Sequence, residues 1–137
     1  MRAEAALQIK LCNYLQDNYP GVLFHSDASS GALASAGVAS MNKRIQFSAG
    51  MPDLYIFAAC KGFHGLFLEL KADGVQIYRR DGELRKNEHV EAQAVMLQAL
   101  RDRGYCALFA IGYDNAVSII NKYLDDSSKT QDKTSLR

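Results

Sequence analysis

Gly50-Met51-Pro52-Asp53, followed later in the chain by Glu69-Leu70-Lys71, is the part of this sequence that decides the fold. Residues 53–57 and 65–71 form two apolar, aromatic-rich runs joined by a short polar connection, a pattern typical of adjacent antiparallel strands. Side chains alternate across a strand, so Glu69 and Lys71 share one face and the leucines of that run share the other. The leucine face predicts a hydrophobic core on one side of the sheet.

Asp53 and Glu69 are candidate metal ligands. Pro52 cannot donate a ladder hydrogen bond and marks the start of a strand, so Asp53 is expected to project from the strand end toward Glu69. Neighbouring carboxylates repel each other unless one is protonated or a cation bridges them, which favours a divalent metal with oxygen ligands. The metal would polarise a phosphate oxygen and activate a water, with Lys71 orienting that water or neutralising charge on the phosphate. A solvated Glu-x-Lys pair on an exposed face is the alternative.

Length and composition indicate one ordinary globular domain. The chain has 137 residues, 48% of them hydrophobic and 23% charged. No run approaches the ~18 apolar residues that a membrane span needs, and the first residues lack the pattern of a signal peptide. We therefore expect a cytoplasmic protein. The three cysteines and three histidines show neither disulfide nor zinc-site spacing.

The net charge of +1 gives no global sign of a nucleic-acid partner. Local basic pairs are the candidate DNA contacts: Lys43 with Arg44, Arg79 with Arg80, and Arg85 with Lys86. The last two pairs flank the turn signal Asp81-Gly82, so residues 72–86 are predicted to form a protruding hairpin with basic arms. This hairpin is expected to contact substrate or a second subunit, and a solvated loop is the alternative.

Periodicity and end signals place the remaining elements. Helices are predicted at residues 2–18, around 33–43, from Asn87 to about Arg103 and from Asp114 to Leu124, with Asn87 and Asp114 as the N-caps of the last two. Strands are predicted at 22–25 and 105–111. From residue 125 onward almost no apolar residue occurs, so we expect a disordered tail.

Two polar residues interrupt the apolar stripes of these helices. Glu4 lies in the stripe of Leu7 and Leu11, and it either complements the helix dipole at the first turn or reaches inward toward the metal region. Gln93 lies in the stripe of the helix that begins at Asn87, and a buried amide must find hydrogen-bond partners. It is either a satisfied core amide or a donor and acceptor for Lys71, a water or a phosphate.

This order of elements, with an acid on the first helix, Pro-Asp and Glu-x-Lys on successive strands and a glutamine on the next helix, resembles the PD-(D/E)XK nuclease superfamily. Within it, the chain is similar to the virus-type replication-repair nuclease (VRR-NUC) family. The resemblance rests on Glu4, Gly50-x-Pro52-Asp53, Glu69-Leu70-Lys71, and Gln93 with Leu100 and Gly104 downstream. It implies an α/β fold with a central mixed sheet flanked by helices, in a single domain over residues 1–124.

The resemblance also implies hydrolysis of DNA phosphodiesters that depends on Mg²⁺ or Mn²⁺. Asp53 and Glu69 would hold the metal, Lys71 would position the attacking water, and Glu4 and Gln93 would support the site. Small members of this kind are viral or bacterial nucleases that form homodimers and cut branched DNA such as four-way (Holliday) junctions. The segment 72–86 is long for the family. A general or restriction-like nuclease, and a non-catalytic DNA-binding module on the same fold, are the alternatives.

Overall fold

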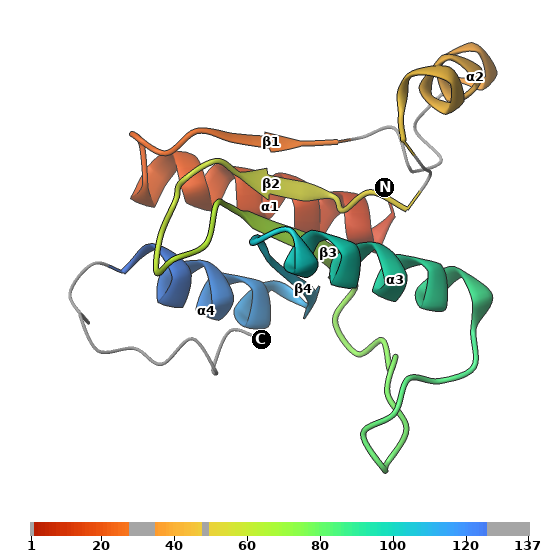
Figure 1. The fold of residues 1–137 in the computed structure, drawn as a ribbon. Helices are drawn as coiled ribbons and strands as arrows, with labels where there is room; N and C mark the ends of the chain where they lie inside the picture. Colours follow the sequence, from red (N-terminus) through yellow and green to blue (C-terminus); the bar gives the residue numbers. More distant parts are fainter. Residues whose placement is uncertain (1, 28–34, 48–49, 126–137) are drawn as a thin grey trace.

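A computed structural model of the chain describes residues 2–27, 35–47 and 50–125 (Figure 1). Its elements, in order, are α1 (Ala3–Asn18), β1 (Phe24–Ser26), α2 (Ala36–Ile45), β2 (Leu54–Ile56), β3 (Leu66–Lys71), α3 (Glu88–Asp102), β4 (Cys106–Ile111) and α4 (Tyr113–Leu124). None of the helices in these ranges is long and apolar enough to cross a membrane.

The strands form one four-stranded sheet in the order β1-β2-β3-β4. The pairs β1-β2 and β2-β3 are antiparallel and the pair β3-β4 is parallel, so the sheet is mixed. Leu54 lies opposite Leu68, which confirms the antiparallel pair predicted from the two apolar runs. A parallel pair needs a long crossover connection, and the hairpin segment together with α3 supplies it. The predicted α/β class, with a mixed sheet flanked by helices, is confirmed.

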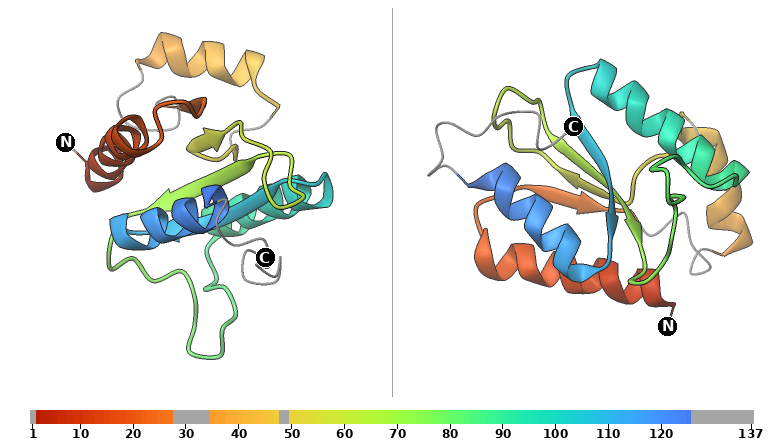
Figure 2. Two further views of the ribbon diagram at one scale, coloured as in Figure 1. Left: turned by 90° about the vertical axis from the view of Figure 1, so that its left-hand side faces the viewer. Right: turned by 90° about the horizontal axis from the view of Figure 1, so that it is seen from below.

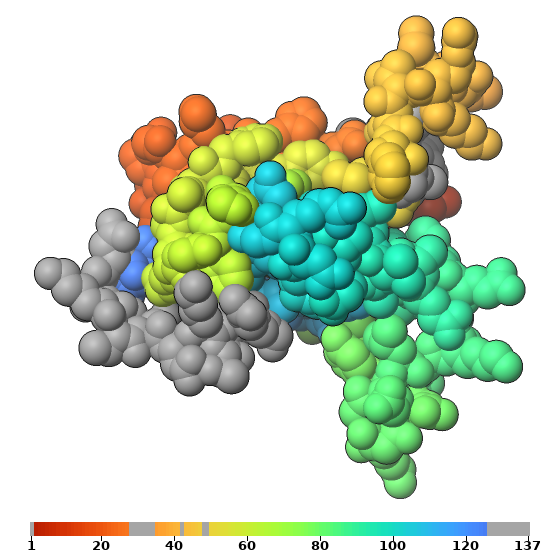
Figure 3. Space-filling model, viewed as in Figure 1, coloured from red at the N-terminus to blue at the C-terminus, as the bar shows by residue number. Residues whose placement is uncertain are grey.

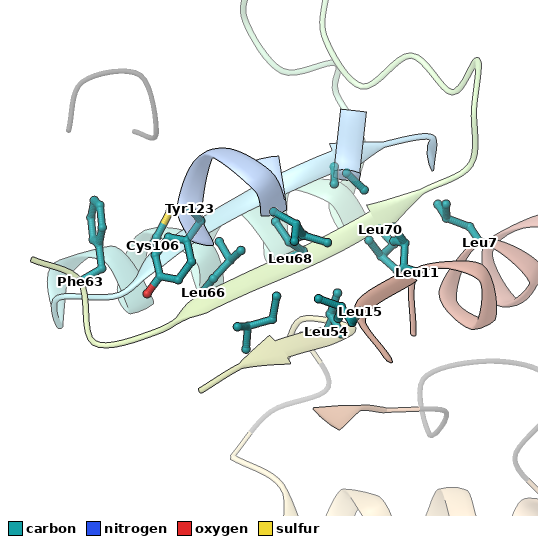
Figure 4. Packing of buried hydrophobic residues seen from close by; sticks show 14 residues of the cluster. Leu7, Leu11, Leu15, Leu54, Phe63, Leu66, Leu68, Leu70, Cys106 and Tyr123 are labelled. Carbon is teal, nitrogen blue, oxygen red and sulfur yellow. The ribbon is translucent and has the colours of Figure 1, made fainter. Parts of the chain in front are cut away.

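The leucine face of β3 carries the hydrophobic core, as predicted. Leucines four residues apart on α1 form one stripe, which packs against this face together with the apolar side of α4 (Figure 4). The central members of the core are Leu7, Leu11 and Leu15 of α1, Leu66, Leu68 and Leu70 of β3, and Ala116, Ile120 and Tyr123 of α4.

The opposite face of β3 and β4 is covered by α3 (Figure 1). The Asn87 side chain caps this helix by accepting hydrogen bonds from the backbone N–H groups of His89 and Val90, as predicted. Because α3 covers this face, Glu69 and Lys71 are buried as well. They are therefore not the solvated surface pair that was the alternative interpretation.

Several boundaries differ from the sequence predictions. The first strand begins two residues later and ends one residue later than expected. The helix expected around residues 33–43 is α2, although residues 33–34 lie outside the described ranges. Asp114 is not the N-cap of the last helix. Gly112 takes that place with φ +80°, and its N–H bonds the carbonyl of Lys71. The positive φ needs glycine, which ends the strand there and starts the helix one residue before Asp114. The tail expected from residue 125 lies outside the described residues after Asp125.

Two arms extend from the body on opposite sides, α2 on one and the segment 72–86 on the other (Figures 1, 2 and 3). In the second arm Tyr78 bridges Leu84, the backbone N–H of Arg79 donates to Glu83 at 2.7 Å, and Gly82 turns with φ +87°. The predicted hairpin is thereby confirmed. On α2 the side chains of Val38, Met41 and Ile45 are exposed.

We predict that Leu68→Ala lowers the free energy of unfolding by about 2–5 kcal/mol. Leu68 is 0% exposed at the centre of the core, so the truncation leaves a cavity that its neighbours fill only in part. The measurement is denaturant unfolding. The matched control is Leu23→Ala, because Leu23 is 75% exposed. Equal losses in the two variants would contradict this account of the core.

Candidate active site

The pairing of β2 with β3 brings Asp53 and Glu69 together. The N–H of Asp53 donates to the carbonyl of Leu68 at 3.0 Å, which extends the ladder one residue before β2 begins. Because Leu54 lies opposite Leu68, Asp53 stands beside Glu69 on the next rung. One oxygen of the Asp53 carboxylate, Oδ2, accepts from the backbone N–H of Leu70 at 2.9 Å. The carboxylate is thus held against the backbone of β3.

The main chain of Asp53 is held from the other side by Ser26, Asp27 and Gln8, none of which the sequence analysis identified. Its carbonyl accepts a hydrogen bond from the Ser26 hydroxyl at 2.8 Å and from the backbone N–H of Asp27 at 3.0 Å. The amide of Gln8 on α1 donates to Ser26 Oγ at 2.6 Å and to the carbonyl of Asp27 at 2.8 Å. Gln8 and Ser26 lie beside apolar runs without any distinguishing motif, so only the tertiary structure reveals this role.

Glu69 is only 4% exposed. Burial is the largest cause that raises the pKa of its carboxyl group to about 9, and the neighbouring charge of Asp53 and a hydrogen bond between the two carboxyl groups add to it. The positive charge of Lys71 acts in the opposite direction, and Glu4 raises the pKa slightly further. A negative charge on Glu69 is therefore costly unless a proton or a cation accompanies it.

The amide of Gln93 reaches this carboxylate from α3. Its Nε2 lies 2.8 Å from Glu69 Oε1 and 3.1 Å from His89 Nε2. Its Oε1 is buried and has no hydrogen-bond partner among the described residues. The prediction that Gln93 points toward the sheet is confirmed, but it is not a satisfied core amide, because half of its hydrogen-bonding capacity stays unused.

Lys71, two residues after Glu69 on β3, lines a cavity of about 370 Å³. The Lys71 side chain is 7% exposed, and within the described residues its ammonium group has no hydrogen bond or ion pair. The same cavity is lined by Glu4, Arg85, Lys86 and His89. Glu4 is exposed in the first turn of α1, where an acid complements the helix dipole, as one of the two interpretations expected. It also lines this cavity together with Lys71, as an acid near the site would.

The predicted DNA-binding residues fall into separate groups. Arg85 and Lys86 line the cavity, and Arg85 is held by Gln76 Oε1 at 2.7 Å. Arg79 and Arg80 lie near the hairpin tip, where Arg79 pairs with Asp81 at 3.4 Å. Lys43 and Arg44 are exposed in the last turn of α2, on the other arm (Figure 2). The structure therefore does not bring all six basic residues onto one surface.

The carboxylate pair fits a divalent cation with oxygen ligands. In the part of the chain that the structure describes, no three Asp, Glu, His or Cys side chains converge to hold a metal ion. Mg²⁺ is commonly held by one or two carboxylates, with waters and substrate phosphates completing its shell. Asp53 and Glu69 supply such a pair, and burial together with the neighbouring charge of Asp53 raises the pKa of Glu69.

Comparison with known proteins assigns the fold. A solved structure described as a VRR_NUC domain protein superposes with a TM-score of 0.64 and 26% sequence identity, over 90% of this chain and 89% of that chain. The sequence matches no protein-family model and no curated protein. The resemblance to the VRR-NUC family and to its PD-(D/E)XK fold is confirmed, and a nuclease-type domain is supported over most of the chain.

We predict a pH dependence of stability that disappears in Glu69→Gln. The folded pKa of about 9 lies above the ordinary value of 4.5, so the contribution of this group is complete below pH 4.5 and is lost as the pH rises toward 9. In the presence of a chelator, the free energy of unfolding of the native sequence should fall by a few kcal/mol relative to the variant over this range. Glu88→Gln, at an exposed glutamate of α3, is the control. Parallel pH profiles for the native sequence and Glu69→Gln would contradict the assignment.

Proposed function

Because the chain has the fold of a VRR-NUC nuclease domain, we propose that it is a divalent-metal-dependent endonuclease that hydrolyses phosphodiester bonds of DNA. One observation supports this above the others: Glu69 contacts both Asp53 and Gln93, and Lys71, two residues after Glu69 on β3, lines a cavity. Two adjacent carboxylates, an amide and a lysine on rigid strands and a helix are suited to phosphate ester hydrolysis.

Asp53 and Glu69 are the proposed metal ligands, for Mg²⁺ or Mn²⁺. When bound, the cation supplies charge for the phosphate and a bound water of lowered pKa. In the reaction a water oxygen forms a bond to phosphorus, one P–O ester bond breaks, and the leaving alcohol takes up a proton. The protein contributes by holding the Asp53 carboxylate through the N–H of Leu70, so that little reorganisation is needed.

Lys71 and Gln93 act on the water and the phosphate. The Lys71 ammonium group orients the attacking water or neutralises the charge that develops on the phosphate oxygens. The unpartnered Oε1 of Gln93 can only accept a hydrogen bond. A phosphate diester has no hydrogen to donate, so the partner of Oε1 is the water or Lys71. Glu4, at the rim of the cavity, adds negative charge that supports the cation.

DNA binding is proposed to involve both arms. Arg85 and Lys86 line the same cavity as Lys71, which supports their assignment as contacts to the phosphates next to the scissile one. Arg80 at the hairpin tip, and Lys43 and Arg44 on α2, would contact the backbone farther out. Phosphate contacts of this type position a duplex without reading its sequence.

We further propose that the substrate is branched DNA, such as a Holliday junction, and that the acting form is a homodimer. A two-fold dimer carries two sites and so suits paired cuts on a symmetric junction. The exposed apolar side chains of Val38, Met41 and Ile45 on α2 support a protein contact there. A general or restriction-like nuclease would cut linear duplex equally well, and a binding-only module would cut neither.

We predict that Lys71→Ala lowers cleavage of a labelled four-way junction by about 10²-fold or more, because it removes the cation that faces the reacting phosphate. Glu69→Ala should lose activity to a similar extent. The assay compares the junction with linear duplex of the same sequence in Mg²⁺, Mn²⁺ or chelator. Lys122→Ala, at an exposed lysine of α4, is the control and should retain full activity.

The outcomes separate the candidate functions. Metal-dependent cutting that prefers the junction supports the full proposal, and equal cutting of both substrates favours the general nuclease. Full activity in both Lys71→Ala and Glu69→Ala would refute the site. Binding without cutting by the folded native protein would favour the non-catalytic module.

Neutralising a DNA contact should weaken binding and reduce its salt dependence. We predict that Lys86→Ala and Arg80→Ala each lower the slope of log K against log salt by about 1, because one phosphate contact is lost. The measurement is fluorescence anisotropy of labelled DNA in chelator over a range of salt concentrations. An unchanged slope in both variants, equal to that of Lys122→Ala, would contradict a role for the hairpin.

A further inference from the structure

His89 and Gln93 lie one turn apart on α3, and their side chains meet. Gln93 Nε2 is 3.1 Å from His89 Nε2 and 2.8 Å from Glu69 Oε1. The backbone of His89 is fixed because its N–H donates to the capping side chain of Asn87 at 3.0 Å. The imidazole is thus attached to the first turn of a capped helix and reaches toward the carboxylate pair through one amide.

The chemistry of the amide assigns the hydrogens. An amide nitrogen carries two hydrogens and accepts no hydrogen bond, so both of its neighbours here must be acceptors. His89 Nε2 is therefore the unprotonated nitrogen of a neutral ring, and the ring hydrogen lies on Nδ1. Glu69 receives the other amide hydrogen.

The structure also shows which way the amide faces. A half-turn about the last bond of the side chain would place Gln93 Oε1 between the Glu69 oxygen and the imidazole nitrogen, where it would be satisfied only if both of these groups carried a hydrogen toward it. In the observed orientation Oε1 has no partner among the described residues although it is buried. The two hydrogen bonds from Nε2 outweigh this unused acceptor and keep Oε1 available.

We propose that His89 is a positioning residue of the candidate active site. Its neutral imidazole accepts the second amide hydrogen of Gln93, which holds the first against Glu69 and leaves Oε1 free for the attacking water or Lys71. The importance of this arrangement for catalysis rests on the proposed nuclease function, whereas the hydrogen-bond assignment stands independently of it.

A second observation places His89 at the site. His89 lines the cavity of about 370 Å³ that Lys71, Glu4 and Lys86 also line. An isolated surface histidine would have no such contacts. His64, on the connection before β3, offers the comparison: it is exposed, as His89 is, but it stacks edge-on against Tyr105 with ring centroids 5.6 Å apart and does not line this cavity.

The first test is independent of activity. A long-range ¹H–¹⁵N spectrum of the folded protein, at a pH at which the ring is neutral, should show His89 with its hydrogen on Nδ1 and an unprotonated Nε2. The His89 signals are assigned by their loss in His89→Gln. The side-chain NH₂ signals of Gln93 should shift in His89→Leu and stay unchanged in His64→Leu. A ring with its hydrogen on Nε2, or Gln93 signals that do not respond to His89→Leu, would overturn the proposal.

The second test is kinetic. His89→Leu removes the acceptor at similar size, and we expect kcat for DNA cleavage to fall about 10-fold or more, with little change in KM, as for residues that orient a metal ligand. His89→Gln keeps an acceptor oxygen at similar reach and should restore most of the activity, while His64→Leu retains it. Equal losses in His89→Leu and His89→Gln, or a rise in KM alone, would contradict positioning.

The two tests distinguish the hydrogen-bond assignment at His89 from the proposed nuclease function. If the native protein shows the Nδ1 hydrogen and the Gln93 response but cuts no DNA, the hydrogen-bond assignment holds and the nuclease proposal fails. If it cuts DNA but shows neither spectroscopic sign, the nuclease proposal holds and the role of His89 fails.

Discussion

The hydrogen bond from the N–H of Asp53 to the carbonyl of Leu68 extends the pairing of β2 with β3 and holds two carboxylates on adjacent strands. Strand pairing fixes side-chain positions more firmly than a loop does, because each rung of the ladder restricts the next. The repulsion between the two acids therefore cannot be relieved by moving apart. Burial and this repulsion together raise the pKa of Glu69, and they favour positive charge at the site.

The polar groups around this pair depend on the two layers that enclose the sheet. On one side the apolar stripes of α1 and α4 anchor the leucine face of β3. On the other side, α3 buries Glu69 and Lys71, and it carries Gln93, which contacts Glu69, and His89, which contacts Gln93. Burial raises the cost of an unpaired charge or hydrogen-bonding group, so the buried side chains of Glu69, Lys71 and Gln93 each need a partner. The same burial that stabilises the fold thus tunes the site.

The two arms add a separate property. The net charge of the whole chain is close to zero, yet basic side chains lie on the hairpin and on α2, away from the core. Short-range contacts between arms and phosphates depend on where the charges lie, and the net charge of the chain does not describe them. The hairpin also connects directly to Lys71, so its Arg85 and Lys86 continue the wall of the same cavity.

Local sequence determined the element types, the antiparallel pair, the core face of β3, the cap at Asn87 and the adjacency of Asp53 to Glu69. Each of these follows from periodicity, capping chemistry or strand alternation, which act over a few residues. Only the tertiary structure decided that α3 covers Glu69 and Lys71, that Gln93 Oε1 is left without a partner among the described residues, and that Gln8, Ser26 and His89 support the site. These features depend on contacts between elements far apart in the chain, whose distances no local pattern encodes. The shift of the N-cap of the last helix from Asp114 to Gly112 has the same origin, because the N–H of Gly112 donates to the carbonyl of Lys71 on a different strand.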